Sequence, residues 1–341
     1  MEPHGKSPQP TQLFFAPSLL RVRGRFIPGS STFAKETRMP SRTSPTALPP
    51  STPSPFQGLW LPLITPFDDA GQVDHPRLAG LTQHYSQAQQ GLSGLVVCGS
   101  TGEAASLTDQ EQQAVLATVL AHTTLPVVMG LSGYHLGHTL ERVAALAPYP
   151  LAGWLVPAPH YIRPSQAGLQ GWFERIADQA RAPLIVYDIP YRTGSTLSLT
   201  TLLALAEHPR IQAIKDCGGD PAKTQALIED GRLQVLAGED AQIFTTLTLG
   251  GHGAIAASAH WQTARFARLL TLLAASDLQA ARGLWHSLLP MISLLFVEPN
   301  PAPIKALLAA QGHLQPHLRA PMTAASPALV QRLLAVDRTA G

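Results

Sequence analysis

Eight short apolar runs, each separated from the next by a segment long enough for one helix, constrain the fold of this 341-residue chain more than any other feature. Strands that alternate with helices pair in parallel, because each helix carries the chain back across the sheet to begin the next strand. Eight such units predict an α/β fold of the (β/α)8 TIM-barrel type rather than an open doubly wound sheet. The predicted strands span residues 59–64, 94–98, 126–129, 153–156, 184–187, 211–215, 233–236 and 253–257.

The turn after the first predicted strand argues against a dinucleotide-binding fold. Such folds carry Gly-x-Gly-x-x-Gly at this point, where glycine lets the backbone approach a pyrophosphate. Residues 65–68 read Thr-Pro-Phe-Asp instead. After about residue 276 the strand signals stop, and helix-like segments follow at 278–296, 303–311 and 327–336. We therefore predict a barrel domain over residues 57–276 and a C-terminal appendage of three helices over residues 277–341.

Residues 1–56 differ in composition from the rest of the chain. They hold 11 prolines, seven Lys or Arg and two acidic residues, with no sustained apolar period. Such a segment cannot bury enough apolar surface to offset its ordering entropy, which predicts a disordered tail. Its Arg and Ser content is compatible with an organelle transit peptide. We favour the alternative of an over-extended start, with Met39 as one possible initiator.

Charge and hydropathy exclude two classes of partner. The chain has a net charge of +2, but residues 1–56 alone carry +5, so the remaining residues carry −3 and form no basic footprint for nucleic acid. No run reaches the ~18 to 20 apolar residues that a membrane span needs. The two cysteines, Cys98 and Cys217, are too few for a disulfide scaffold, and they fit a reducing cytoplasm.

A lone lysine, Lys215, ends the apolar run at 211–215. A charged group at the end of a buried strand is costly unless it has a partner or a chemical role. Burial disfavours the ammonium form of a lysine, so its amine becomes a usable nucleophile at neutral pH. Formation of a Schiff base with a carbonyl substrate requires such an amine. The alternative is a lysine that extends its head group past the strand end into solvent.

The second predicted strand runs into a loop that reads Gly-Ser-Thr-Gly-Glu over residues 99–103. In (β/α)8 barrels the functional residues lie where strands end and the following loops begin. The glycines permit a tight loop whose backbone N–H groups can face a carboxylate, with the hydroxyls of Ser100 and Thr101 beside them. The alternative is an ordinary Ser or Thr cap of the next helix.

The fifth predicted strand ends at Tyr187, and Arg192 follows five residues later. A tyrosine hydroxyl at a strand end can relay protons, and a guanidinium offers a planar fork for a substrate carboxylate. The alternative is a tyrosine ring packed inward and an arginine in solvent. Small residues over 250–254 would keep a pocket open at the eighth strand.

Together these residues resemble the dihydrodipicolinate synthase / N-acetylneuraminate lyase family of class I, pyruvate-dependent aldolases. The resemblance covers the chain from Gly58 to about Thr323. It is carried by residues 99–103 (GSTGE), 159–165 (PHYIRPS), 187–194 (YDIPYRTG), 214–215 (IK), 238–240 (GED) and 298–301 (EPNP), in that order.

The resemblance implies a role for each candidate site residue. Lys215 would form an imine with pyruvate, and Tyr187 would act as proton relay and general acid/base. Ser100 would link Tyr187 to Tyr161, which would reach in from a neighbouring subunit. Thr101 would help to hold the pyruvate carboxylate. No cofactor is implied beyond the imine itself, and the expected assembly is a homotetramer built from dimers.

Further residues bear on the choice of branch within the family. Gly238 and Ile255 complete the expected substrate contacts. Arg192 is similar to a marker of the synthase branch that clasps the carboxylate of L-aspartate 4-semialdehyde, on the route to diaminopimelate and lysine. Three departures from the residues usual in synthases, Ser100, Asp188 and the pair Cys217-Gly218, are expected near the pocket and are compatible with a different aldehyde.

Two other functions stay open at this point. One is another pyruvate-dependent aldolase or dehydratase that acts on a 2-keto-3-deoxy sugar acid or on N-acetylneuraminate. The other is a non-catalytic descendant that binds a keto acid. Retention of the whole proton relay argues against the second, because a sensor does not need it.

Three further expectations concern regulation and other chemistry. Lysine-inhibited relatives carry histidines, an asparagine and a glutamate at a dimer-interface site, and the residues that match them here predict weak or absent lysine feedback. No His-Glu-x-x-His pattern accompanies His135 and His138, so we expect no metal site. Cys98 is expected to pack rather than react. The residues that match the lysine site are Asp109, Gln112, Tyr134 and His138, with His160 in place of a tyrosine.

Overall fold

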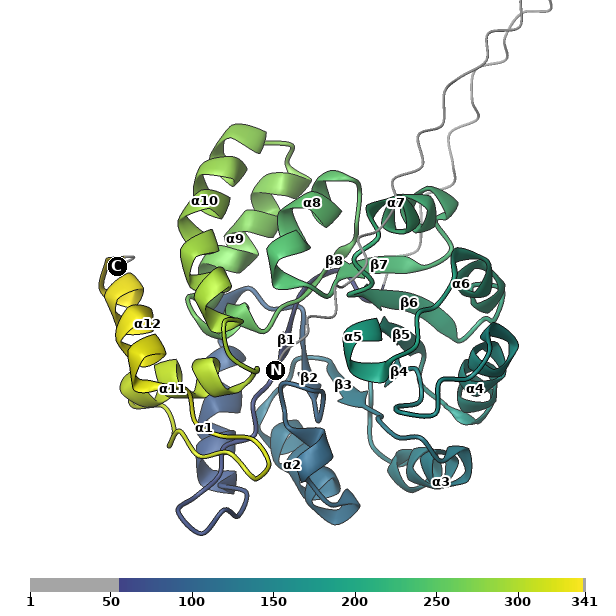
Figure 1. Ribbon diagram of the computed structural model, residues 1–341, viewed down its shortest axis with the longest axis horizontal. Helices are drawn as coiled ribbons and strands as arrows, with labels where there is room; N and C mark the ends of the chain where they lie inside the picture. Colours follow the sequence, from purple (N-terminus) through teal and green to yellow (C-terminus); the bar gives the residue numbers. More distant parts are fainter. Residues whose placement is uncertain (1–54, 340–341) are drawn as a thin grey trace, which may run out of the picture. The chain divides into compact units, whose positions relative to one another are not determined.

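Eight parallel strands close into a barrel in the computed structural model, which describes residues 55–339 (Figure 1). Each strand pairs with the strand before it, and β8 pairs with β1, so the barrel has no open edge. The strands are β1 (Gly58–Pro62), β2 (Gly94–Val97), β3 (Val127–Gly130), β4 (Gly153–Pro157), β5 (Leu184–Asp188), β6 (Ile211–Asp216), β7 (Gln234–Ala237) and β8 (Gly253–Ile255).

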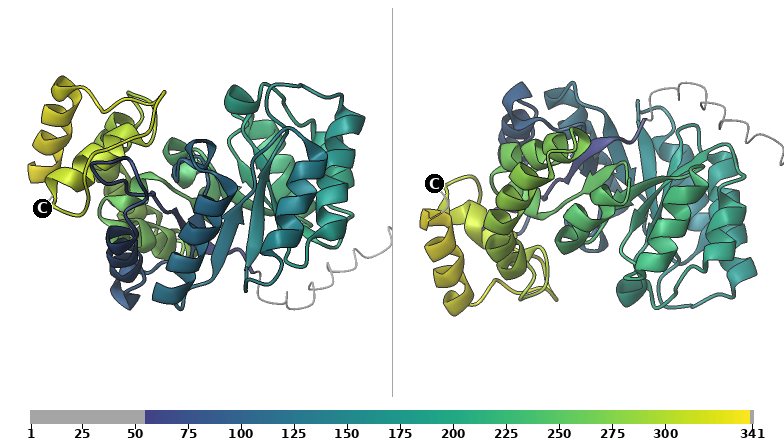
Figure 2. Two further views of the ribbon diagram at one scale, coloured as in Figure 1. Left: turned by 90° about the horizontal axis from the view of Figure 1, so that it is seen from below. Right: turned by 90° about the horizontal axis from the view of Figure 1, so that it is seen from above.

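Helices surround the strands, and those at the C-terminal end continue beyond the ring (Figure 1). Helices α10 to α12 gather on one side of the barrel in both views of Figure 2. The helices are α1 (His75–Tyr85), α2 (Asp109–His122), α3 (Leu136–Leu146), α4 (Gln166–Gln179), α5 (Pro190–Thr193), α6 (Leu199–Leu205), α7 (Pro221–Asp230), α8 (Ile243–Thr248), α9 (Thr263–Ala274), α10 (Leu278–Leu295), α11 (Ala302–Ala310) and α12 (Pro327–Thr339).

The predicted barrel and its three C-terminal helices are therefore confirmed. Each predicted strand overlaps an observed one, and the ends differ by no more than two residues. The predicted tail over residues 1–56 lies outside the described residues apart from its last two positions. Of these, Phe56 is buried and its ring lies 5.8 Å from that of Trp60. Phe56 thus packs as part of the barrel rather than as part of a tail.

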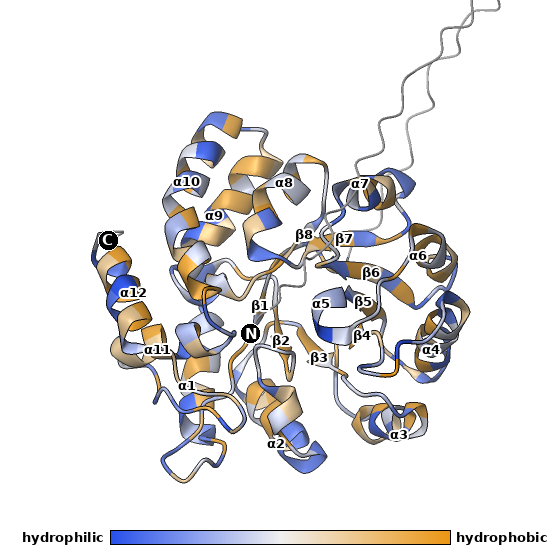
Figure 3. Cartoon of the chain, viewed as in Figure 1, coloured by the Kyte–Doolittle hydropathy of each residue, from blue (hydrophilic) through white to orange (hydrophobic). Residues whose placement is uncertain are grey.

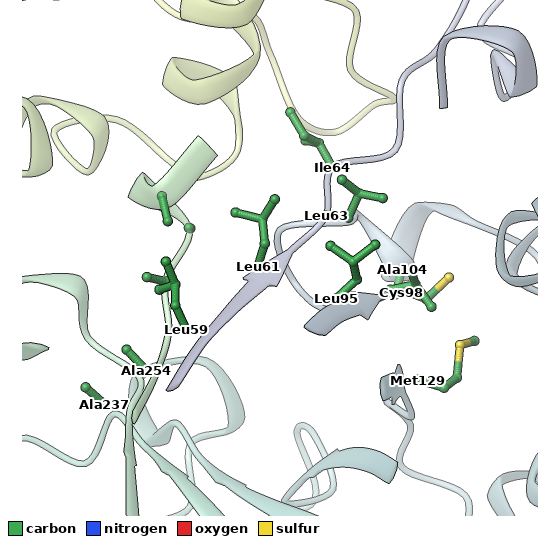
Figure 4. Packing of buried hydrophobic residues seen from close by; sticks show 14 of the residues in the cluster. Leu59, Leu61, Leu63, Ile64, Leu95, Cys98, Ala104, Met129, Ala237 and Ala254 are labelled. Carbon is green, nitrogen blue, oxygen red and sulfur yellow. The ribbon is translucent and has the colours of Figure 1, made fainter. Parts of the chain in front are cut away.

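Alternation along each strand divides the buried residues into two cores, because successive side chains of a strand point to opposite faces. Leu59 and Leu61 point outward from β1 toward the helices (Figure 4), whereas Trp60 between them points into the barrel. The strands are mostly apolar and the helices mix apolar with polar residues (Figure 3), as expected for strands buried on both faces. The inner core contains Phe56, Trp60, Val96, Val128, Leu155, Ile185, Tyr187, Ile189, Ala213, Cys217, Leu236 and Ile255.

The same alternation directs two chemically important side chains into the barrel. Ile185 on β5 and Ala213 on β6 belong to the inner core, so the residues two positions later share their face. Those residues are Tyr187 and Lys215, which lie opposite one another in the pairing of β5 with β6. The register of two parallel strands therefore brings the phenol and the amine together at the carboxyl-terminal end of the barrel.

None of the helices between residues 55 and 339 is both long and apolar enough to cross a membrane.

Candidate active site

A cavity of about 420 Å³ lies at the carboxyl-terminal ends of the strands and contains most of the predicted site residues. This is the end of a (β/α)8 barrel at which enzymes of this fold place their chemistry. The loops after β2, β5 and β7 contribute to its wall, and so does the segment that follows α10. The cavity is lined by Ser100, Thr101, Tyr187, Tyr191, Arg192, Lys215, Gly238, Glu239, Asp240, Ala257, Phe296, Val297, Glu298, Pro299 and Asn300.

Lys215 and Tyr187 form the centre of this cavity. Both residues are buried, and the Lys215 Nζ atom donates to the Tyr187 hydroxyl over 3.4 Å. The same Nζ lies 4.4 Å from the centroid of the Tyr187 ring. No carboxylate forms a salt bridge with Lys215 among residues 55–339. The lysine therefore ends inside the cavity beside a phenol, not in solvent past the strand end.

The Tyr187 hydroxyl is in contact with a second hydroxyl. Burial raises the pKa of Tyr187 well above its ordinary value, and a hydrogen bond with the Ser100 side chain partly opposes this rise. The phenol is consequently protonated at neutral pH and acts as both donor and acceptor. Ser100, Tyr187 and Lys215 thus form a connected chain from the loop after β2 to the end of β6.

Gly238 leaves the room that this arrangement needs. A Cβ atom at Gly238 would lie 2.4 Å from the Cys217 Sγ atom and 2.8 Å from the Lys215 Cγ atom. Those separations are too short for any side chain, so only glycine lets the backbone after β7 pass beside the lysine stem. Ile255, which was also expected to touch substrate, is buried in the inner core and does not line the cavity.

The loop that holds Thr101 is fixed from two sides. Thr101 is buried, and its Oγ1 atom accepts a hydrogen bond from the Asn300 Nδ2 atom over 3.0 Å. The cap of α2 is Thr108, whose side chain and that of Glu111 form a capping box. The helix-cap alternative for Ser100 and Thr101 is therefore wrong, and their hydroxyls are available to the cavity.

An ion pair anchors the end of the same loop. Glu103 has a left-handed backbone with φ of +54°, which is unfavourable for a residue other than glycine. Its buried carboxylate pairs with Lys305 of α11, a residue with no exposed surface. Lys305 also donates to the His317 carbonyl over 2.8 Å and lies 4.2 Å from the centroid of the Phe67 ring. The C-terminal helices thus hold the loop that carries Ser100 and Thr101.

Arg192 lies at the mouth of the cavity on the short helix α5. It is exposed, and no acidic side chain of the described chain pairs with it. The hydroxyl of the neighbouring Tyr191 donates to Glu239 Oε1 over 2.7 Å, which joins α5 to the loop after β7. The mouth therefore offers an unpaired guanidinium beside a fixed carboxylate.

Tyr161 does not line the cavity within one chain. Its side chain is 90% exposed and its φ is +70°, and it borders a shallow recess shared with Tyr191 and Arg192. A non-glycine residue holds such a backbone conformation only where its surroundings impose it. Tyr191 and Arg192 line both this recess and the cavity, so they connect the surface that holds Tyr161 with the site.

Asp188 was expected near the pocket, and this prediction is wrong. Its Oδ2 atom accepts from the Lys223 Nζ atom of α7 over 2.5 Å, and both side chains are buried away from the cavity. A Cβ atom at Gly218 would lie 2.6 Å from the Lys223 Nζ atom, so the glycine makes room for this pair. Asp188 and Lys223 therefore form a buried ion pair for which Gly218 leaves room, and neither Asp188 nor Gly218 lines the cavity.

Cys98 and Cys217 lie near the site, but neither has the low pKa that a nucleophilic thiol needs. Burial raises the pKa of the Cys98 thiol to about 12, which keeps it protonated at neutral pH. Cys217 belongs to the inner core, and burial raises its pKa well above the ordinary value. The expectation that Cys98 packs rather than reacts agrees with this burial.

Several cavity residues carried no predicted role, notably Tyr191, Glu239 and Asn300. Glu239 lies two residues after the end of β7, so its place near a strand end could have identified it. Asn300 comes from the segment after α10 and reaches Thr101 across 199 residues of sequence. No local pattern in the sequence indicates that contact.

Comparisons with known proteins agree with this geometry. Residues 55–336 match the dihydrodipicolinate synthetase family. A 4-hydroxy-tetrahydrodipicolinate synthase 2 of Clostridium acetobutylicum is 36% identical over 283 residues, which cover 82% of this chain and 98% of that protein. A 4-hydroxy-tetrahydrodipicolinate synthase of Limosilactobacillus fermentum is 38% identical over 267 residues, which cover 76% of this chain and 84% of that protein.

A solved structure agrees equally well. The dihydrodipicolinate synthase of Acinetobacter baumannii, described as chloride inhibited and complexed with pyruvate, has a TM-score of 0.80 and 30% identity to this chain. The match covers 84% of this chain and 99% of that one. The chain therefore belongs to the dihydrodipicolinate synthetase family.

Proposed function

We propose that this protein is a 4-hydroxy-tetrahydrodipicolinate synthase, a lyase that condenses pyruvate with L-aspartate 4-semialdehyde in the diaminopimelate route to lysine. The observation that carries the proposal is the pairing of Lys215 with Tyr187 inside a cavity whose mouth holds the unpaired Arg192. A buried amine beside a phenol suits Schiff-base chemistry, and the guanidinium suits an aldehyde that bears a carboxylate. The synthase names of the two bacterial relatives support the same assignment.

In the proposed first half-reaction, the Lys215 amine attacks the pyruvate carbonyl carbon and water leaves, which forms an imine. Thr101 and the backbone of its loop hold the pyruvate carboxylate, while Asn300 occupies one acceptor site of the Thr101 hydroxyl. Because Asn300 donates to that oxygen, the hydroxyl proton of Thr101 is directed to another acceptor. This arrangement favours a donor that points into the cavity.

In the second half-reaction, the protonated imine withdraws electrons and the pyruvate methyl group loses a proton. The resulting enamine carbon bonds to the aldehyde carbon, and the aldehyde oxygen takes up a proton. Tyr187 exchanges these protons through Ser100 and, from a neighbouring subunit, Tyr161. The amine of the second substrate then adds to the imine carbon, which closes the ring and releases Lys215. The sequence of steps needs no cofactor other than the imine.

We further propose that the working assembly is a homotetramer built from dimers, in which Tyr161 completes the relay of its neighbour. Tyr134 and Ile162 are also exposed, and the His160 N–H donates to the Gly133 carbonyl, which holds their two loops together. Apolar side chains that gather on one surface are typical of an interface. A cytoplasmic location, expected from the two cysteines, stays a prediction.

The decisive experiment is turnover of pyruvate with L-aspartate 4-semialdehyde, coupled to reduction of the product by a reductase and NADPH. A kcat/KM of about 10⁴ M⁻¹s⁻¹ or more would lie in the range of native reactions and support the synthase. A negligible rate together with a borohydride-trapped pyruvate adduct on Lys215 would assign the chain to an aldolase of another substrate, with sugar-acid aldehydes the next to be assayed.

A further inference from the structure

Three carboxylates line the cavity, but two of them are already occupied. Asp240 is buried and its Oδ2 atom accepts from the Ser258 N–H over 2.5 Å. Glu298 accepts from the N–H and the hydroxyl of Ser326, which precedes α12. Both groups therefore serve the fold, and neither offers its charge to a ligand in the cavity.

Glu239 is the third carboxylate and has no cationic partner within residues 55–339. Its Oε1 atom accepts from the Tyr191 hydroxyl, and a hydrogen bond also joins it to the Cys217 thiol. Both of these donors are neutral, so they orient the carboxylate without compensating its charge. Glu239 thus presents a negative charge to the cavity at a fixed position.

Glu239 and Arg192 are held in a defined relationship to one another. Arg192 follows Tyr191 directly on α5, and the Tyr191 hydroxyl binds Glu239 on the loop after β7. One hydrogen bond therefore sets the spacing of two opposite charges that do not pair with each other among the described residues. Opposite charges held apart in one cavity are complementary to a ligand that carries both signs.

We propose that Glu239 binds the α-ammonium of the aldehyde substrate whose α-carboxylate the proposed function already assigns to Arg192, so that Glu239 selects a zwitterionic aldehyde over an anionic one. This inference rests on the proposed function, since L-aspartate 4-semialdehyde carries both groups on one carbon. An aldehyde that carries a carboxylate but no ammonium would leave the negative charge of Glu239 without a counter-charge. Its own carboxylate would also place a second negative charge near that of Glu239 at the mouth of the cavity. Glu239 would therefore discriminate by repulsion as well as by attraction.

Glu239→Gln separates this role from catalysis, because glutamine keeps the length of the side chain and an oxygen for the Tyr191 hydroxyl. The kinetics of the intact enzyme are measured with L-aspartate 4-semialdehyde, and succinate semialdehyde, which lacks the amine, is tested as a competitor. The variant should raise the KM for L-aspartate 4-semialdehyde about tenfold or more, as expected for loss of a charged hydrogen bond. The KM for pyruvate and the yield of borohydride-trapped adduct should stay within about twofold of wild type, since Glu239 does not take part in imine formation.

The inhibition constant of succinate semialdehyde provides the matched control. It should stay unchanged or fall in Glu239→Gln, because removal of a carboxylate removes repulsion toward an anionic competitor. An unchanged KM for L-aspartate 4-semialdehyde, or an equal loss of affinity for both semialdehydes, would overturn the inference and leave Glu239 with a structural role.

A second variant, Tyr191→Phe, tests the spacing rather than the charge. It removes the hydrogen bond that orients Glu239 and should weaken the preference for L-aspartate 4-semialdehyde over succinate semialdehyde by a smaller factor than Glu239→Gln. If Tyr191→Phe weakened this preference more than Glu239→Gln does, the assignment of the selectivity to the Glu239 carboxylate would be overturned. If wild-type enzyme fails to turn over L-aspartate 4-semialdehyde at all, the proposed function itself fails, which is distinct from an active enzyme that ignores the loss of Glu239.

Discussion

The carboxylate of Glu103 and the ammonium of Lys305 form a buried ion pair that joins the loop after β2 to helix α11. Burial raises the pKa of Glu103 and lowers that of Lys305, while the attraction between the two groups opposes both shifts. Each group is therefore kept ionised in the fold mainly by the presence of the other. The active-site loop is thus stable only when α11 is in place.

Removal of one partner of this pair should be severely destabilising. We expect Lys305→Met to lower the free energy of unfolding by about 3 to 5 kcal/mol, because it leaves a buried carboxylate without its ion-pair partner. The double variant Glu103→Gln/Lys305→Met should recover a large part of this loss. Urea denaturation of the three proteins measures the difference, and a single variant as stable as wild type would contradict the role of the pair.

Substitutions of Lys215 and of Tyr161 should have different effects on imine formation and on turnover. Lys215→Ala should fold but give no borohydride-trapped pyruvate adduct, since the attacking amine is gone. Tyr161→Phe should still form the adduct while its kcat falls about 10²-fold or more, because only proton relay is impaired. Mass spectrometry after reduction identifies the adduct. An adduct retained in Lys215→Ala would place the nucleophile elsewhere.

Lysine should inhibit this enzyme weakly or not at all. Asp109 at the expected regulatory position already binds His138 at 2.8 Å and Arg142 at 3.0 Å. The largely buried Arg142 also donates to Gln112 and to the Ser132 carbonyl. A lysine ammonium would compete there with an internal guanidinium for the same carboxylate. Initial rates measured with lysine up to about 1 mM test this, and half-inhibition below that concentration would disprove it.

Protonation of His260 should destabilise the fold in mild acid. Burial lowers the pKa of His260 to about 4, below the 6.5 of an exposed histidine. Between those values the unfolded chain binds more protons, so this contribution is complete above pH 6.5 and is lost as the pH falls toward 4. The total loss is on the order of 3 kcal/mol. Its Nε2 atom accepts from the Ile64 N–H, which fixes the neutral ring in place.

The matched control for this effect is His260→Gln, compared with wild type by urea denaturation from pH 8 to pH 4. The variant should be less stable at pH 8 but lose less stability on acidification. An identical pH slope in both proteins would mean that other groups cause the acid sensitivity.

The juxtaposition of Lys215 and Tyr187 can be predicted from the sequence because it follows from strand periodicity. Lys215 and Tyr187 end apolar runs, and parallel strands of one barrel bring their ends together. The supporting residues do not follow such a rule. Asn300 and Lys305 reach the loop after β2 from about 200 residues away, and the contacts exist only after the chain has folded.

Asp188 illustrates the opposite error. It departs from the residue usual in the family, and the resemblance therefore predicts it near the pocket. The alternation of a strand turns it to the other face, where Lys223 neutralises it. Its partner lies 35 residues further along the chain, and only the structure identifies the two as a pair.

The ion pair between Glu103 and Lys305 also has a consequence for folding during synthesis on the ribosome. The ribosome completes all eight strands and the loop after β2 well before it reaches Lys305. Until that residue emerges, the loop lacks the cation that allows its glutamate to be buried as a carboxylate. A chain truncated before Lys305 would therefore contain Lys215 and Tyr187. Its loop after β2, which we propose holds the pyruvate carboxylate, would still lack a fixed conformation. In this protein the synthesis of α11, which follows all eight strands, decides whether the barrel made before it becomes an enzyme.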